Sequence, residues 1–149
     1  MKEAMENAKE ELKRIDHLIY VTLKYTRTVD VFINIIERMV TCYEFLVDAL
    51  MKLAEKEKKI NEKIDMPVAK ANALLKIYDS KKIKDNIEFY LQLRKLKRAN
   101  YESSNEFRRH VTMTAVVDGK VININIDNIT ENFHMLKDFL EFVDKRIQI

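Results

Sequence analysis

The sequence predicts a mainly α-helical bundle of about five helices, with one β-hairpin inserted before the C-terminal helix. Three observations lead to this fold class. The 149 residues include one glycine and one proline, too few for the turns of an all-β fold. Apolar residues in the first third of the chain recur at steps of three and four. Near the C-terminus, a stretch alternates with period two around an Asp-Gly pair.

The N-terminal third of the chain carries an apolar seam from residue 12 to residue 54. Polar Thr22 and Thr26 interrupt the seam, and the branched residues around them lower helix propensity. We therefore expect two helices that separate near Arg27, with Thr28 as the cap of the second. The alternative is one unbroken helix of about 50 residues, which is too long for a small domain and would require a partner chain.

The remaining helices are delimited by breaker and capping residues. Pro67 disfavours helical backbone at the residue before it, so a boundary is expected there. A third helix is predicted over residues 68–78 and a fourth from residue 83 or 85 to 99. A last helix is predicted over 130–147, with Thr130 as its cap.

The β-hairpin is predicted over residues 111–126, with Asp118-Gly119 as its two-residue turn. Met113, Ala115 and Val117 are expected to share one face of the first strand. A two-stranded ribbon alone is marginally stable in water. Its apolar face is therefore expected to pack on the bundle or to meet the hairpin of another subunit.

Length and composition favour a single domain over residues 1–149. Apolar residues make up 47% of the chain, enough to bury a core without metal or disulfide. Cys42 lies among apolar neighbours, which predicts a packed thiol in a reducing compartment. No leader pattern is recognisable, and no apolar run approaches the ~20 residues of a membrane span. We expect a cytoplasmic protein without membrane association.

Composition also excludes several functional classes. A single glycine cannot provide a phosphate-cradling loop or a dinucleotide fingerprint, so no nucleotide cofactor is predicted. The net charge of +3, from 27 basic and 24 acidic residues, is far below that of a dedicated duplex-DNA binder.

The densest basic stretch of the sequence lies in segment 94–110. Guanidinium groups pair with phosphates and aromatic rings stack on unpaired bases, so this segment is a candidate RNA site. Basic residues at a helix C-terminus also complement the helix dipole and keep the surface soluble, which is the competing interpretation. The candidate residues are Arg94, Lys97, Arg98, Tyr101, Arg108 and Arg109.

Two further groups of polar residues are candidate sites. His17, Tyr25, Arg27 and Asp30 flank the expected helix break, where their alternative task is to satisfy exposed helix-end groups. His134 follows Glu131 by three residues, a spacing found in di-iron bundles, but those proteins need the motif twice and it occurs here once. We therefore predict no metal site.

Residues 16–30, together with Glu106-Phe107-Arg108-Arg109-His110, resemble uncharacterised archaeal helical proteins. The helical part also resembles, in outline, the HEPN bundles, which commonly dimerise and often cleave or bind RNA. HEPN ribonucleases carry an Arg followed by His after four to six residues. Here Arg14 lies too close to His17, and Arg98 too far from His110. The resemblance thus implies self-association and does not imply nuclease activity.

The leading hypothesis is a non-catalytic interaction module, homodimeric through the long second helix or the hairpin edge. This hypothesis rests on the number of apolar residues on that helix, which is larger than one face of a bundle is expected to bury. An RNA-binding or RNA-processing protein using segment 94–110 is the alternative. A third hypothesis is an enzyme centred on His17 or His134. The apolar residues of the second helix on which the first hypothesis rests are Ile33, Ile35, Ile36, Met39, Val40 and Phe45.

Overall fold

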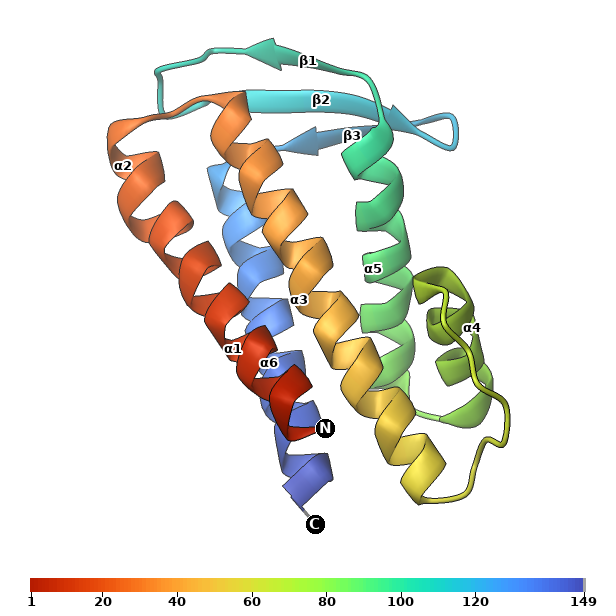
Figure 1. The fold of residues 1–149 in the computed structure, drawn as a ribbon. Coiled ribbons are helices and arrows are strands. Elements are labelled where there is room, and N and C mark those ends of the chain that lie inside the picture. The colour runs from red at the N-terminus through yellow and green to blue at the C-terminus, as the bar shows by residue number, and fades with distance from the viewer. Residues whose placement is uncertain (149) are drawn as a thin grey trace.

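The computed structural model describes residues 1–148, as a helical bundle with a small sheet across one end (Figure 1). The helical segments are α1 (Lys2–His17), the π-helix η1 (Leu18–Thr22), α2 (Leu23–Tyr25), α3 (Val29–Lys56), α4 (Pro67–Ile77), α5 (Lys81–Arg98) and α6 (Ile126–Gln148). The strands are β1 (Tyr101–Ser104), β2 (Thr112–Val117) and β3 (Lys120–Ile124). The predicted fold class is confirmed, with β1 as an additional strand.

Helix α3 is the centre of the bundle and packs against α1, α4, α5 and α6. Its aliphatic side chains are therefore used within one chain. Ile35, Ile36, Met39 and Val40 are buried, and Ile33 and Phe45 are half-buried against the core. The reason for expecting a dimer through this helix, an excess of apolar surface, does not hold.

The first helical hairpin breaks where the sequence predicts. The backbone leaves the helical region at Thr26, and α3 begins at Val29, so the unbroken-helix alternative is wrong. Thr28 occupies the N-cap position as expected. Its side chain makes no capping hydrogen bond, however, and Asp30 supplies the only acidic group of the first turn.

The π-helix η1 follows from the spacing of buried residues. Ile15, Ile19 and Leu23 are all buried and lie four residues apart. Because an α-helical turn takes 3.6 residues, repeated steps of four rotate these side chains around an α-helix. The wider turns of a π-helix compensate for that rotation and keep the three side chains facing the core.

The later helices begin slightly earlier than predicted. Pro67 is the first residue of α4, and Ser80 caps α5 by accepting a hydrogen bond from the Ile83 N–H at 3.3 Å. Helix α6 starts at Ile126, so the prediction of Thr130 as its cap is wrong. Thr130 lies within α6, past its first turn, and its hydroxyl donates to the Ile126 carbonyl at 2.6 Å.

Asn125 and Asn128 instead start α6 with a reciprocal cap. The Asn125 side chain accepts from the Asn128 N–H, and the Asn128 side chain accepts from the Asn125 N–H, both at 2.9 Å. This arrangement is the asparagine counterpart of a capping box, because two otherwise unpaired backbone donors are satisfied at once.

The predicted hairpin is confirmed, with Asp118 and Gly119 in the turn at φ of 52° and 77°. Positive φ at both positions defines a type I′ turn, whose twist matches that of the strands. Met113, Ala115 and Val117 face the helices and are buried, as expected. Strand β1 was not predicted; it pairs antiparallel with the other edge of β2, giving the order β1-β2-β3.

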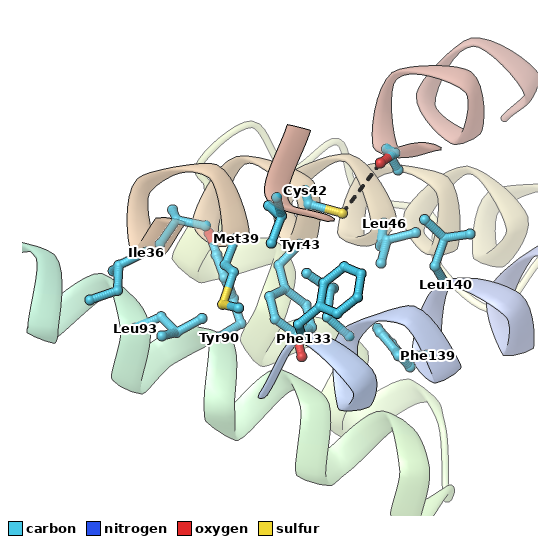
Figure 2. Close-up of a cluster of buried hydrophobic side chains, with 14 of the residues drawn as sticks. Ile36, Met39, Cys42, Tyr43, Leu46, Tyr90, Leu93, Phe133, Phe139 and Leu140 are labelled. Atoms are coloured by element: carbon cyan, nitrogen blue, oxygen red, sulfur yellow. Dashed lines mark hydrogen bonds between the residues drawn. The ribbon is translucent and has the colours of Figure 1, made fainter. Parts of the chain in front are cut away.

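Aromatic residues occupy the middle of the bundle, between α3, α5 and α6 (Figure 2). Tyr43 lies between Tyr90 and Phe139, with ring centroids 6.0 Å from each. The Tyr43 hydroxyl donates to the side-chain oxygen of buried Asn86 at 2.8 Å, and the Asn86 amide donates to the Lys82 carbonyl. The buried polar groups of this core are therefore paired.

Candidate functional site

Exposed apolar side chains collect where the sheet covers the end of the bundle. We call Tyr25, Tyr101, Phe107, Val116 and Val121 the sheet-end surface; Tyr25 is 83% exposed, Phe107 76% and Val121 66%. Apart from Met66 and Val68, the large exposed hydrophobic residues of the described chain all lie on β1, β2, β3, their connectors or the adjoining end of the first helical hairpin. Tyr25 and Phe107 lie at the connector end of the sheet and Tyr101, Val116 and Val121 lie nearer the hairpin turn, so the exposed apolar side chains are spread along the sheet. Exposed apolar surface of this extent marks an interaction surface.

Phe107 is presented to solvent by a constrained backbone. Its φ is 67°, in the left-handed region that bulky residues seldom adopt. Its N–H donates to the Arg27 carbonyl at 2.7 Å, which ties the β1–β2 connector to the α2–α3 junction. The bond to Arg27 leaves the aromatic ring of Phe107 exposed, and backbone outliers of this kind cluster at functional sites.

The outward face of the sheet adds branched side chains to this surface. Val116 and Val121 are cross-strand partners, and both are exposed. Thr114 pairs with Asn123 on the same face and donates to its side-chain oxygen at 2.9 Å. Along β2 and β3 these outward-facing side chains are therefore uncharged, and all of them except Asn123 are β-branched.

The two edges of the sheet differ in what covers them. At the β3 edge, the Asn128 side chain donates to the Asn123 carbonyl at 2.7 Å. Strand β1 forms the other edge, and all four of its residues are exposed. In an antiparallel ladder, alternate residues of an edge strand direct N–H and C=O groups away from the sheet. β1 is the edge to which another strand has access.

The predicted basic site is divided between the two ends of the sheet (Figure 1). Arg94, Lys97 and Arg98 lie in the last turns of α5, where Lys95 contacts Asp118 of the hairpin turn. Arg108 and Arg109 lie in the β1–β2 connector at the opposite end, where Phe107 contacts Arg27. Tyr101, at the start of β1, lies on the α5 side. The six residues do not form one patch.

Carboxylates neutralise part of this basic segment. Arg94 pairs with Glu44 at 2.6 Å and its guanidinium also donates to the Tyr90 hydroxyl, which makes it a link between α3 and α5. Arg109 pairs with Asp127 at 2.8 Å. Within residues 1–148, Lys97, Arg98 and Arg108 have no ion-pair partner; these three remain the charges available to an anionic ligand.

The predicted polar cluster is also dispersed. His17 lies at the end of α1 in a groove against α3, whereas Tyr25 points into solvent at the end of α2. Arg27 is half-buried and its Nε is buried without a hydrogen-bond partner in the described chain. Asp30 lies exposed on the first turn of α3, where it complements the helix dipole.

Cys42 and His134 take structural positions. Burial is the main cause that raises the pKa of Cys42 from 9.0 to about 12, and its thiol donates to the Ala8 carbonyl at 3.5 Å (Figure 2). A thiol in this state is a poor nucleophile. His134 Nε2 lies 3.2 Å from the Tyr20 hydroxyl and connects η1 to α6. Residues 1–148 contain no cluster of three or more His, Cys, Asp or Glu side chains arranged to hold a metal.

Comparison of the chain with protein-family models, curated proteins and solved structures gives no significant match. The resemblance to HEPN bundles stays a prediction. Among residues 1–148, no helix combines the length and the apolar character needed to cross a bilayer.

Proposed function

We propose that this protein is a non-catalytic interaction module that forms a homodimer through its sheet-end surface. The observation that carries the proposal is that the large exposed apolar side chains of the described chain, apart from Met66 and Val68, all lie at one end of the bundle. Aromatic side chains with few rotatable bonds are characteristic of the buried centres of protein interfaces.

The charge of this end of the molecule supports a second copy as the occupant. The sheet, its connectors and the adjoining helix junction, segments 20–30 and 99–128, contain equal numbers of basic and acidic residues, so these segments carry no net charge. Lys95, Lys97 and Arg98 lie beside them in the last turn of α5. A two-fold interface apposes the same surface on both subunits, which requires such self-complementarity. The basic residues are Lys24, Arg27, Arg108, Arg109 and Lys120, and the acidic ones are Asp30, Glu102, Glu106, Asp118 and Asp127.

The strand edge supports the same arrangement. The β1 edge is free, short and polar, so main-chain pairing with a second β1 would supply orientation, while the apolar side chains supply most of the binding energy. Helix α3, the other surface considered for dimerisation, is covered within the monomer.

Multi-angle light scattering and sedimentation of the purified protein test this proposal. We expect a dimer at roughly 100 µM, a concentration that populates any dimer of about −5.5 kcal/mol or tighter. Phe107→Asn combined with Val121→Thr is expected to shift the mass toward the monomer. Asparagine tolerates the left-handed backbone at position 107, so this variant should remain folded.

Met66→Asn is the matched control. Met66 is 70% exposed, close to Phe107 at 76%, but lies before α4, outside the sheet-end surface. The control should dimerise as the unmodified chain does. A monomeric unmodified protein at this concentration, or equal loss of dimer in both variants, would contradict the proposal.

RNA binding is a second candidate, favoured by one observation. Lys97 and Arg98 lack ion-pair partners in the described chain and precede the exposed ring of Tyr101. Fluorescence anisotropy with a short oligouridylate tests it over a salt series. RNA binding requires affinity that falls with salt and weakens in Lys97→Gln/Arg98→Gln. Unchanged affinity in this variant excludes the α5 end as an RNA site.

A further inference from the structure

A groove of about 350 Å³ lies between α1 and α3, and five of its seven lining residues carry side-chain hydrogen-bond donors. Lys13, Arg14 and His17 line the groove from α1, where His17 follows Lys13 by four residues and Arg14 by three. Asn34 and Arg38 face them from α3, one helical turn apart. We call this the α1–α3 groove; Glu10 is the only carboxylate on its lining.

A buried carboxylate orients the two arginines of this groove. Glu11 is only 5% exposed, and its Oε1 accepts from Arg14 Nη1 at 2.7 Å. Arg38 Nη1 donates to both Glu11 oxygens at 3.4 Å. The two guanidinium groups are thereby held side by side, although like charges repel. Their proximity is not needed to fill the core, because both side chains are about half exposed.

The groove retains excess positive charge and unused donors. Lys13, Arg14 and Arg38 oppose the two carboxylates of Glu10 and Glu11, which leaves one net positive charge among these five side chains. Lys13 Nζ pairs with Glu10 Oε1 at 3.5 Å, and both side chains are largely exposed. Each guanidinium carries five N–H bonds. The bonds to Glu11 involve only the Nη1 atom of each arginine, so the remaining donors are available to a ligand.

We propose that the α1–α3 groove binds a small phosphate monoester. Two oriented guanidinium forks match the oxygens of a phosphate, and the additional donors of Lys13, His17 and Asn34 exceed what the two oxygens of a carboxylate can accept. The volume lies within the range of small-molecule sites, and the groove is bounded by two packed helices rather than by loops.

NMR titration of the ¹⁵N-labelled protein with AMP, at constant ionic strength, tests this inference. Constant ionic strength removes general screening effects. We expect saturable shifts at residues 10–18 and 34–38, and smaller ones with a short oligouridylate, whose internal phosphates are diesters. Stronger binding of the oligouridylate at these residues would overturn the assignment to a monoester.

Two variants in the groove make the test specific. Arg38→Gln should weaken AMP binding about tenfold or more, as expected for loss of a charged hydrogen-bond donor pair. Because this change leaves Glu11 with one partner, Asn34→Leu provides a second variant. The Asn34 side chain is exposed and makes no hydrogen bond in the described chain, so the fold is not at risk. It should weaken binding several-fold.

Lys76→Gln is the control, because it removes one exposed positive charge from the last turn of α4, outside the α1–α3 groove. Retained AMP affinity in Lys76→Gln, with loss in Arg38→Gln, supports the α1–α3 groove. The competing site is a groove of about 370 Å³ between α4 and α5, which contains Arg94, Lys95 and Arg98. Equal loss of affinity in both variants, or shifts confined to α4 and α5, would overturn the proposal.

Discussion

The Phe107 N–H donates to the Arg27 carbonyl across 2.7 Å and joins two segments that are eighty residues apart in the sequence. This bond fixes the β1–β2 connector over the α2–α3 junction. It also holds Phe107 in left-handed backbone with its ring in solvent. The most exposed aromatic side chains of the sheet-end surface, those of Tyr25 and Phe107, thus belong to two segments that are held together by the main chain.

Phe107→Pro tests the importance of this connection for folding. Proline has no N–H to donate, and its ring fixes φ near −65°, so it cannot adopt the φ of 67° found here. We expect a loss of more than about 1 kcal/mol in the free energy of unfolding, measured by urea denaturation. Phe107→Asn should stay within about 0.5 kcal/mol of the unmodified chain. Equal stability of both variants would show that the connector is not held by this bond.

The buried pair of Tyr43 and Asn86 offers a test of the core. Tyr43→Phe leaves the Asn86 side-chain oxygen without the donor it has at 2.8 Å, and an unpaired buried acceptor costs about 1–3 kcal/mol. Asn86→Leu removes the acceptor instead. In a double-mutant cycle, the two changes should be non-additive by about 1 kcal/mol. Additive losses would indicate that the hydrogen bond contributes nothing to stability.

Cys42 makes the stability of the protein sensitive to alkaline pH. Its pKa is raised from 9.0 to about 12, chiefly by burial, with a smaller contribution from the charge of Glu11. The folded state therefore retains a proton that the unfolded state loses. This contribution is complete below pH 9 and is lost between pH 9 and about 12, at up to about 1.4 kcal/mol per pH unit.

Urea denaturation at pH 8, 9 and 10 should show this decline, and Cys42→Ala should reduce its slope while lowering stability at every pH. Burial also raises the pKa values of Tyr43 and Tyr90, and these groups steepen the decline at higher pH. The same slope with and without Cys42 would contradict the assignment.

The start of α6 provides a test of helix capping. Asn125→Ala removes the acceptor for the Asn128 N–H and should lower the free energy of unfolding by about 1 kcal/mol. Thr130→Ala is the matched control, because its hydroxyl bonds only to the Ile126 carbonyl within the helix. We expect a change below about 0.5 kcal/mol for the control. A larger loss of stability in Thr130→Ala than in Asn125→Ala would show that Thr130 contributes more to the start of α6.

The elements that the sequence predicts are those with strong local signals. Pro67 starts α4, and Asp118-Gly119 forms the hairpin turn, because both act through their own backbone preferences. Strand β1 has no such signal: Tyr101-Glu102-Ser103-Ser104 shows no alternation of buried residues, and it pairs only because the edge of β2 is available. Thr130 is a good cap by composition, but the earlier pair of Asn125 and Asn128 satisfies two donors rather than one.

Candidate sites are harder to predict, because neighbours in sequence are separated in space. Segment 94–110 contains β1, and the four extended residues of this strand, about 13 Å long, lie between its two basic ends. The α1–α3 groove has the opposite property: Arg14 and Arg38 meet through Glu11 although 24 residues separate them. The spacing of Lys13, Arg14 and His17 on one helical face was visible in the sequence, but their partners on α3 depend on how the helices pack.

The hairpin turn allows backbone strain to be separated from steric conflict. Gly119 has a φ of 77°, and a Cβ at this position would contact no atom within 4 Å. Gly119→Ala should therefore destabilise the protein through backbone conformation alone, by about 1 kcal/mol. Gly119→Asn should cost less, because asparagine adopts left-handed backbone more readily. Asp118→Asn provides the adjacent control: it removes the pair with Lys95 but keeps a residue suited to φ of 52°, so its effect should stay below about 0.5 kcal/mol. Urea denaturation of the three variants measures the order of their free energies of unfolding. If Asp118→Asn is the most destabilising change, the contact with Lys95 rather than the turn geometry fixes the hairpin against α5.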